Sequence, residues 1–207
     1  MANKTRSLIE TYVPSFLEVF PGLETKLEPW LLASDVEAHF AKMPPLANLE
    51  DFRKTGNAYI HPTAIVERNV QIRGFAVISA GCFIASNAYL RGGVILGPNT
   101  HVGPGVELKS VLCSGNTAFA HLNYVGNSVV GTGVNLEAGV IIANHLNESP
   151  GTTIKIKQEN SVVDTGLLKF GALIGDGAKI GANSVLSPGT ILKGSEVISR
   201  LSLVKQL

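Results

Sequence analysis

Residues 88–108 read AYLRGGVILGPNTHVGPGVEL, and aliphatic residues recur in this stretch at every sixth position. The step is marked by Leu90, Leu96, Val102 and Leu108, each with a small or β-branched residue two positions before it. An α-helix would spread every sixth residue over drifting faces, so the step excludes a helix. It fits short strands joined by turns and stacked as a triangular coil, in which three six-residue units complete one coil of eighteen residues.

The same step continues on both sides of this stretch. It begins at Ile60, stops after Leu108, resumes at Val130 and, after a second interruption, runs from Ile174 to Ile198. Stacked coils of this kind place their aliphatic residues in columns inside a prism. Glycine often follows the aliphatic residue, where we expect turns that favour a residue free of steric limits. These glycines are Gly97, Gly103, Gly131, Gly175 and Gly181.

The first part of the chain differs in composition, with many Leu, Glu, Phe and Lys residues and few glycines. Apolar residues in SLIETYVPSFLEVF recur three and four positions apart, which predicts a short helix that is kinked or ended near Pro14. The segment SDVEAHFAKM predicts another helix, capped by Ser34 or Asp35. We therefore expect a helical cap or arm over residues 1–57 and a repeat domain over residues 58–207.

Composition excludes several classes of protein. The chain has 207 residues with 17 basic and 16 acidic side chains, and no basic run exceeds two residues, which argues against a nucleic-acid binder. No apolar run reaches membrane-spanning length, and the start MANKTRSLIE lacks the apolar core of a secretory signal. Cys82 and Cys113 form no CxxC pair, which argues against a disulfide or zinc framework. We expect a cytoplasmic protein without membrane or nucleic-acid partners.

Residues 118–127 read AFAHLNYVGN and fall where the six-residue step fails. From Leu108 to Val130 is 22 residues, two fewer than the 24 that a regular step needs. A regular step would also place Ala120 in the interior, where it would be a poor filler beside Ile and Leu. We therefore expect tightened turns that take this segment out of the coil wall and leave His121 and Tyr124 facing a cleft. His121, Arg91 and Lys109 are expected to converge on one groove.

The repeat resembles the hexapeptide-repeat left-handed β-helix, and the likeness sharpens between Arg91 and Asn144. There the chain carries LRGG, VELK, HLNYVGN, VNLEAG and ANHLN in that order. These segments are similar to the motifs LRPG, VE-x-K, HL-x-Y-x-GD, VN-x-GAG and CNYDG. Those motifs belong to the acetyltransferase domain of the bifunctional UDP-N-acetylglucosamine pyrophosphorylase/glucosamine-1-phosphate N-acetyltransferase family. The later repeats also resemble archaeal sugar-1-phosphate nucleotidyltransferase/acetyltransferases.

The resemblance implies a fold and an activity. The fold is mainly β, a left-handed parallel β-helix with a small N-terminal helical region. The activity is acetyl-CoA-dependent N-acetyl transfer to an amino sugar phosphate, in a homotrimer with sites between neighbouring prisms. Residues 1–57 are too few to form the family's nucleotide-binding domain, so pyrophosphorylase activity is not expected.

The resemblance also implies roles for single residues. His121 matches the general base, because neutral imidazole can take the proton of an attacking amine near neutral pH. Arg91 and Lys109 match residues that hold the sugar phosphate through charge-assisted hydrogen bonds. Ala182 matches a position near the acyl group, and Arg200 in VISRL matches a contact to a phosphate of coenzyme A. Three further residues match substrate contacts, namely Tyr124, Asn135 and Asn144.

Two departures from the family concern the acceptor. His145 stands where the CNYDG motif has tyrosine, and a phosphate-contacting lysine of the family falls near Pro150 here. Lys155 or Lys169 are the candidates to replace that lysine. These departures leave the use of coenzyme A in place and point away from glucosamine 1-phosphate itself.

Other functions remain open at this point. The chain could be a non-catalytic β-helix that acts as a binding or scaffold protein, or an acyltransferase for another small acceptor, including an O-acyltransferase. The DTG tripeptide at 164–166 lacks the fold and the second carboxylate of an aspartic protease. A γ-type carbonic anhydrase shares the β-helix but needs three zinc-binding histidines, and its close HxxxxH pair is missing here. We therefore expect no metal.

Overall fold

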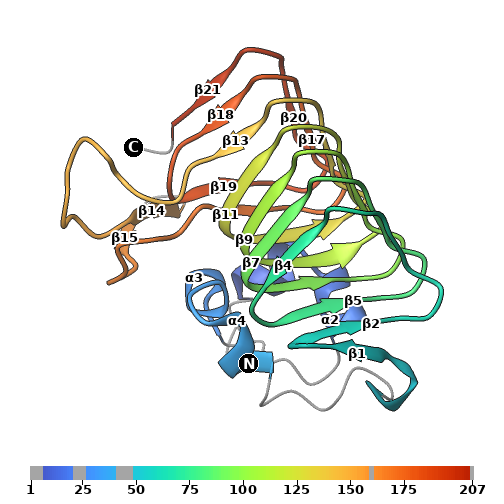
Figure 1. Cartoon of the computed structure of the whole chain (residues 1–207). Coiled ribbons are helices and arrows are strands. Elements are labelled where there is room, and N and C mark those ends of the chain that lie inside the picture. Colours follow the sequence, from blue (N-terminus) through green and yellow to red (C-terminus); the bar gives the residue numbers. More distant parts are fainter. Residues whose placement is uncertain (1–6, 21–26, 41–48, 159–160, 206–207) are drawn as a thin grey trace.

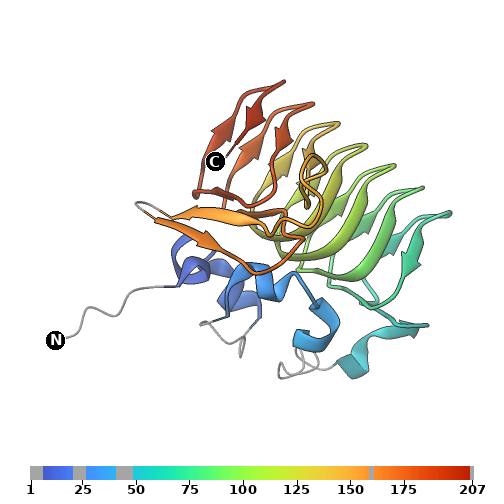
Figure 2. The ribbon, with the colours of Figure 1, turned by 90° about the vertical axis from the view of Figure 1, so that its left-hand side faces the viewer.

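The structure is a computed structural model that describes residues 7–20, 27–40, 49–158 and 161–205. Its main body is a parallel β-helix whose coils stack along one axis (Figures 1 and 2), which confirms the predicted mainly β fold. Each coil has three sides that meet at three edges. Short helices lie against one of these sides, and an antiparallel hairpin projects near them.

We name the sides by their features. The covered side, which faces the helices, contains β2 (Ala58–Ile60), β5 (Ala76–Ile78), β16 (Ala172–Ile174), β19 (Thr190–Leu192) and the second halves of β7 (Tyr89–Leu96), β9 (Glu107–Gly115) and β11 (Tyr124–Thr132). The Tyr124 side contains β4 (Gln71–Arg73), β13 (Ile141–Ile142), β18 (Val185–Leu186), β21 (Leu203–Val204) and the first halves of β7, β9 and β11.

The third side is a separate sheet, which we call the seven-strand side. It consists of β3 (Ile65–Val66), β6 (Phe83–Ile84), β8 (His101–Val102), β10 (Ala118–Phe119), β12 (Asn135–Leu136), β17 (Lys179–Ile180) and β20 (Val197–Ile198). Two antiparallel pairings complete the strands, β1 (Arg53–Thr55) with β2 and β14 (Lys155–Gln158) with β15 (Ser161–Asp164).

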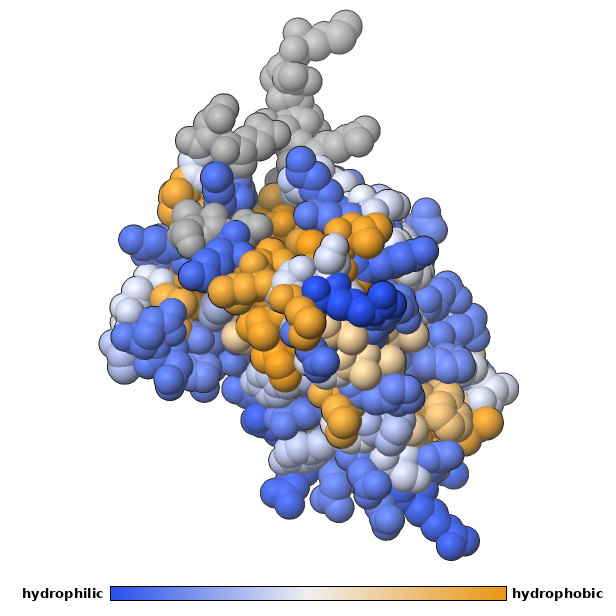
Figure 3. All heavy atoms as spheres, turned by 90° about the horizontal axis from the view of Figure 1, so that it is seen from above, coloured by the Kyte–Doolittle hydropathy of each residue, from blue (hydrophilic) through white to orange (hydrophobic). Residues whose placement is uncertain are grey.

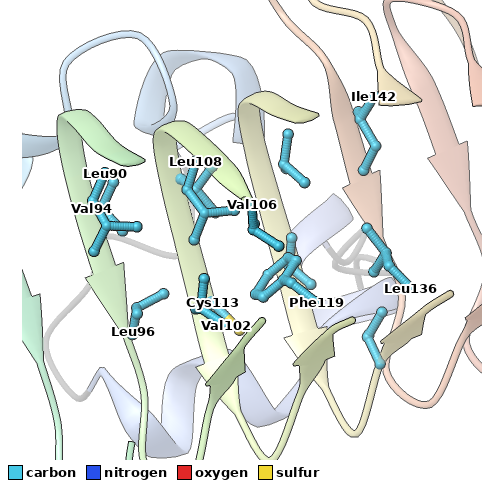
Figure 4. Close-up of a cluster of buried hydrophobic side chains, with 14 of the residues drawn as sticks. Leu90, Val94, Leu96, Val102, Val106, Leu108, Cys113, Phe119, Leu136 and Ile142 are labelled. Carbon is cyan, nitrogen blue, oxygen red and sulfur yellow. The ribbon is translucent and has the colours of Figure 1, made fainter. Parts of the chain in front are cut away.

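The interior holds the predicted aliphatic columns, but the register differs from the expected one. The column positions after Leu108 are occupied by Cys113, Phe119, Val125 and Val130, all fully buried. The steps between them are five, six, six and five residues, so the two missing residues are lost one at a time. Figure 4 labels Cys113 and Phe119. Phe119 fills the place that a regular step would have given to the small neighbouring alanine.

Segment 118–127 therefore does not leave the coil wall, and that expectation was wrong. Its first two residues form β10, and Tyr124 begins β11. Two corners are shortened: Ser110 alone separates Lys109 from Val111, and Asn127, inside the segment, alone separates Gly126 from Ser128. In β7 the two residues Gly92 and Gly93 fill the equivalent place. The step fails because each of these two corners is one residue shorter, and the strands on either side stay in the prism.

Glycine serves the stacking in a way that the sequence did not reveal. At Gly103 the backbone is outside the left-handed region, so turn conformation does not require glycine there. A Cβ at this position would instead overlap the carbonyl oxygen of Ala120 in the next coil. The reason is close approach between coils.

The described N-terminal helices cover the outer face of the covered side. They are α1 (Leu8–Tyr12), α2 (Ser15–Val19), α3 (Pro29–Leu32), α4 (Val36–Phe40) and the 3₁₀ turn η1 (Leu49–Asp51). Helix α1 starts with a capping box at Ser7, and Pro14 separates α1 from α2 as expected. Asp35 rather than Ser34 caps α4, because its Oδ1 accepts from the Ala38 amide. Phe16, Trp30 and Val36 are buried against outward-facing residues of the coils, such as Ile95, Leu112 and Val129.

One corner carries an insertion. Val129 pairs with Leu173, 44 positions later, which is 26 more than a coil of eighteen. The extra residues form a loop and the β14–β15 hairpin, which is anchored by buried Ile154 and Ile156. Phe170 closes the insertion, and its ring lies edge-on to Trp30 at 6.1 Å between centroids. The insertion and the helices thus share one hydrophobic cluster.

Candidate functional site

The Tyr124 side is bounded by two edges on which the candidate residues lie. The His121 edge joins it to the seven-strand side, at the top of Figure 1, and contains residues 103–106, 120–123, 137–140, 181–184 and 199–202 of successive coils. The Asn144 edge joins it to the covered side and contains residues 91–94, 109–111, 126–128 and the insertion. The edges therefore flank one face of each coil.

Cations gather at the Asn144 edge. Arg91 and Lys109 are direct register partners on adjacent coils, as their eighteen-residue spacing predicted. Arg91 donates to Glu107 Oε1 from Nη2 at 2.6 Å and from Nε at 2.7 Å. Lys109 lies beside Lys169, which returns from the insertion, and burial first, then the charges of Lys169 and Arg91, lower the pKa of Lys109. Like charges held together in this way are typical of a site that binds an anion.

Tyr124 and Asn144 lie against these cations. Burial first, then the Glu107 carboxylate, raises the pKa of Tyr124, while Arg91 and a hydrogen bond with Asn144 oppose that shift. The phenol therefore stays neutral and can donate or accept a hydrogen bond. Gly126 leaves the space between the two side chains free, because a Cβ there would lie 2.7 Å from Asn144 Cγ and 2.8 Å from Tyr124 Oη.

A buried amide network supports Asn144 from behind. Asn127 Nδ2 donates to the carbonyl of Ala33, directly after α3, at 2.9 Å. Asn144 Nδ2 donates to Asn127 Oδ1 at 2.7 Å, and Asn144 Oδ1 lies 3.3 Å from His145 Nδ1. Asn127 sits in a tightened corner with φ of 43°, a conformation that asparagine tolerates better than most residues.

Sequence reasoning missed two members of this arrangement. Glu107 stands in the quoted VELK segment, and its alternation with Lys109 already placed it on the same outer face. Asn127 gave one signal, since asparagine is common where the backbone is left-handed, but its contact with Ala33 spans 94 positions. Nothing in the local sequence indicates that contact.

His121 occupies the other edge of the same coil as Tyr124, so within one chain it does not converge with Arg91 and Lys109 on one groove as expected. It is exposed, and its imidazole makes no hydrogen bond or ion pair with the described part of the chain. Its carbonyl accepts from the Gly139 amide at 2.9 Å, and the Leu122 amide donates to Pro104 at 3.1 Å. Regular coil-to-coil bonds therefore hold the backbone of His121, while its ring faces outward.

Ala182 and Arg200 lie on the His121 edge two and three coils further along. The amide of Leu201, which follows Arg200, donates to the Ala182 carbonyl at 2.9 Å, so Ala182 and Arg200 stack in one column. Glu137 lies between this pair and His121, and it accepts from the Ala182 amide at 2.8 Å and from Arg200 Nη2 at 2.6 Å. Stacking in one column places both coenzyme A candidates on the edge that carries the candidate base.

Asn135 does not join either group. It is exposed in β12 on the seven-strand side, between Ala118 and Lys179 of the neighbouring coils. Arg91, Lys109, Tyr124 and Asn144 come together at the Asn144 edge, whereas Asn135 faces another side of the prism.

Two hollows, each of about 280 Å³, open beside the insertion. One is bordered by His145 and Lys169, together with Leu146, Thr152 and Leu168. The other is bordered by Lys155 and Lys205, near Ser187 and Pro188. Of the two lysines proposed to replace the family's phosphate contact, Lys169 is therefore the one that meets Lys109.

The described residues hold no group of three His, Cys, Asp or Glu side chains that could bind a metal ion. Among the helices in the described ranges, none is long and apolar enough to cross a membrane.

Comparison with known families agrees with this architecture. Residues 75–110 match the model of the bacterial transferase hexapeptide (six repeats) family. The coils over these residues carry the hexapeptide repeat of this family. Curated relatives match a larger part of the chain.

The bifunctional protein GlmU of Methanococcus vannielii is 34% identical over 157 residues, which are 67% of this chain and 37% of the relative. The bifunctional sugar-1-phosphate nucleotidylyltransferase/acetyltransferase of Sulfurisphaera tokodaii is 33% identical over 145 residues, 70% of this chain and 36% of the relative. The chain thus spans well under half the length of these relatives.

Among solved structures, perosamine N-acetyltransferase of Caulobacter crescentus, in complex with CoA and GDP-perosamine, is similar to 70% of this chain. The match covers 51% of that chain at 16% identity and a TM-score of 0.30. A superposition of this extent says nothing about the site.

Proposed function

We propose that the protein is an acyl-CoA-dependent N-acyltransferase that acetylates an amino sugar phosphate. The observation that carries this proposal is the cluster at the Asn144 edge, where Arg91, Lys109 and Lys169 surround Tyr124 and Asn144. The relative from Sulfurisphaera tokodaii is named a sugar-1-phosphate nucleotidylyltransferase/acetyltransferase. An anion site beside hydrogen-bonding side chains suits an acceptor that carries both a phosphate and sugar hydroxyls.

The acceptor phosphate would bind between the cations. Arg91 and Lys109 lie on adjacent strands, roughly 4.8 Å apart, so both can reach the oxygens of one phosphate. The phosphate competes with Glu107 for the Arg91 guanidinium, and such exposed ion pairs stabilise a fold by only about 0–1 kcal/mol. Lys169 adds a third donor from the insertion. Tyr124 and Asn144 then contact the sugar next to the phosphate.

His121 would act as the general base. The amine nitrogen attacks the thioester carbonyl carbon, a new C–N bond forms, and the amine proton passes to the unprotonated ring nitrogen of His121. The carbon–sulfur bond then breaks, and the sulfur leaves with a proton as free coenzyme A. The imidazole of His121 is exposed and has no hydrogen-bond partner among the residues that the structure describes, so it is available for this transfer.

The acyl donor would lie along the His121 edge. Ala182 has a small side chain that would leave space for the acyl group, and Arg200, whose side chain is 72% exposed, would meet a phosphate of coenzyme A. Glu137 holds the guanidinium of Arg200 at this edge. The donor would thus reach His121 along the stacking axis.

Assembly as a homotrimer would close the site. Leu122 and Leu201 occupy the left-handed corner positions of their coils, with φ of 53° and 60°, and are 68% and 78% exposed. Seen from above this edge, hydrophobic atoms gather among polar ones (Figure 3). Exposed leucines in an unfavourable backbone conformation are typical of a contact surface. A neighbouring prism there would bring its own side chains to His121, and Asn135 would serve a neighbour's site. Light scattering should give a mass near three chains.

The test is a thiol-release assay. Purified protein is incubated with acetyl-coenzyme A and a panel of amino sugars with and without phosphate, and free thiol is followed. We expect release with phosphorylated amino sugars and an acetylated amine in the product. Absence of release across the panel would favour the scaffold alternative, and ester products would identify an O-acyltransferase.

A further inference from the structure

The amide network fixes which atom each asparagine presents. A carbonyl oxygen can only accept, so the Ala33 carbonyl must face the NH₂ group of Asn127. Asn127 Oδ1 therefore faces Asn144, and Asn144 must answer with its own NH₂ group. Ala33, Asn127 and Asn144 are all buried, so water does not compete for these bonds. Hydrogen-bond chemistry thus determines the orientation of the amide groups of Asn127 and Asn144.

The same logic reaches His145. Because the NH₂ group of Asn144 is committed to Asn127, its oxygen points the other way and lies 3.3 Å from His145 Nδ1. That oxygen can only accept, so in the neutral imidazole Nδ1 carries the proton and Nε2 keeps a lone pair. The carbonyl of Ala33, directly after α3, thereby determines the tautomer of His145, which lies 112 positions later in the chain.

His145 lies where a substrate would meet it. It borders the hollow of about 280 Å³ together with Lys169. Lys169 also contacts Lys109 in the cation cluster, so one lysine borders both the hollow and the anion site. A ligand in the hollow would therefore lie beside the Lys169 ammonium and beside His145, whose Nε2 can accept a hydrogen bond.

We propose that His145 is a specificity-determining residue, whose Nε2 accepts a hydrogen bond from a hydroxyl or amine of the acceptor substrate next to its phosphate. The substrate class is taken from the proposed function, whereas the tautomer follows from the amide network alone. A ligand with an acceptor, such as a carbonyl or carboxylate, at that place would leave Nε2 unpaired and bind more weakly.

The first test is independent of activity. The protein is labelled with ¹⁵N-histidine, and two-bond ¹H–¹⁵N spectra of the five imidazoles are recorded above the pH at which they titrate. His145→Gln identifies the signal of His145. We expect the Nδ1–H tautomer for His145, opposite to the Nε2–H form that free histidine prefers, and its loss in Asn144→Leu. An Nε2–H pattern in the unaltered protein overturns the proposal even if Asn144→Leu does not fold.

The second test uses kinetics. His145→Leu should raise KM for the acceptor by up to about tenfold, the size of one hydrogen bond, with KM for acetyl-coenzyme A unchanged. His145→Gln should retain part of the contact, because its side-chain oxygen can still accept. His61→Leu, on a different edge of the prism, is the matched control and should leave both constants unchanged.

The outcomes separate two failures. If the unaltered protein acetylates no acceptor, the proposed function fails. The tautomer measurement still decides whether the chain of hydrogen bonds from Ala33 to His145 fixes the imidazole. If it does turn over and His145→Leu has the KM of the unaltered protein, the specificity role is wrong while the acyltransferase stands.

Discussion

The two edges of the Tyr124 side are built differently. At the His121 edge every described coil turns in the same way, with a left-handed residue at Asn69, Asn87, Gly105, Leu122, Gly139, Asn183 and Leu201. At the Asn144 edge the turn changes from coil to coil: two residues in β7, one in β9, and a 26-residue insertion further on. One edge keeps the repeat, and the other departs from it.

Polar contacts follow the same division. The irregular Asn144 edge holds a dense network in which Arg91, Tyr124 and Asn144 each have partners. On the regular His121 edge Glu137 pairs with Arg200, but the exposed leucines and the His121 imidazole have no polar partner within the described ranges. The proposed substrate-binding side chains are therefore held in place at the irregular Asn144 edge. The proposed base, His121, lies on the regular edge, where a ligand or a second copy of the chain would supply its contacts. The predictions below test this contrast, beginning with the largest effect.

The largest effect is expected from the regular edge. His121→Ala should lower turnover about 10²-fold or more, the usual contribution of a general base, without unfolding the protein. The backbone bonds of His121 do not involve its ring, so the coil should stay intact. Steady-state kinetics with circular dichroism measures both quantities.

Pro104→Ala is the matched control, because Pro104 is the exposed residue directly beneath His121 in the same column. It should keep turnover near that of the unaltered protein. Equal rates for His121→Ala and the unaltered protein would remove His121 from the mechanism and leave the Asn144 edge as the whole site.

The fold was predictable from the sequence because one-dimensional stacking repeats its pattern. Aliphatic columns such as Leu90, Leu96 and Val102 report the interior of every coil without any long-range information. The register after Leu108 was mispredicted because a corner that loses one residue leaves no mark of its own in the sequence. Phe119, a large residue one place before the expected position, was the available signal.

The site was predictable in part. Spacing placed Arg91 over Lys109, and the resemblance supplied Tyr124 and Asn144, which do lie beside the cations. Choosing Lys169 over Lys155 needed the path of the insertion, and the role of Asn127 needed its contact with α3. Contacts made through inserted segments depend on packing, which a repeat pattern does not encode.

Substitutions at the irregular Asn144 edge should weaken substrate binding more than they lower turnover. Lys109→Ala should weaken binding of a sugar phosphate by about tenfold to a hundredfold, the range of one charge-assisted hydrogen bond. Turnover at saturating acceptor should change far less. Isothermal titration with a non-reactive sugar phosphate measures the affinity.

Lys193→Ala removes an exposed cation from another edge and is the matched control. It should bind the phosphate as the unaltered protein does. Equal weakening by both variants would mean that the protein attracts anions by its overall charge, and the cation cluster would lose its special role.

A smaller effect should come from a single added methyl group. Gly126→Ala places a Cβ 2.7 Å from Asn144 Cγ, and Asn144 cannot retreat because Asn127 holds it. Tyr124, whose hydroxyl is the far end of a flexible side chain, should move, and KM for the acceptor should rise about tenfold through misplacement. Gly194→Ala is the control, since its nearest neighbour would lie at an ordinary 3.4 Å. An unchanged KM in Gly126→Ala would show that the Tyr124–Asn144 contact is dispensable.

The smallest expected effect is a shift in the pH at which phosphate affinity falls, which depends on the interaction among the clustered cations. Burial, then Lys169 and Arg91, lower the pKa of Lys109, so this lysine loses its proton at a lower pH than an ordinary lysine. Phosphate affinity should therefore fall as the pH rises through that lowered value, because the bound anion needs the charged form.

Lys169→Ala removes the largest charge effect on Lys109, so the pKa of Lys109 should rise toward its ordinary value and the fall in affinity should move to higher pH. Stability gives the complementary sign. Between the lowered folded value and the ordinary unfolded value the unfolded chain binds more protons, so stability rises with pH in that window. The window should narrow in Lys169→Ala. Lys109→Arg should abolish the pH dependence of affinity, since arginine stays charged throughout. Identical midpoints in Lys169→Ala and the unaltered protein would show that Lys169 does not act on Lys109, and the insertion would then have no part in the anion site.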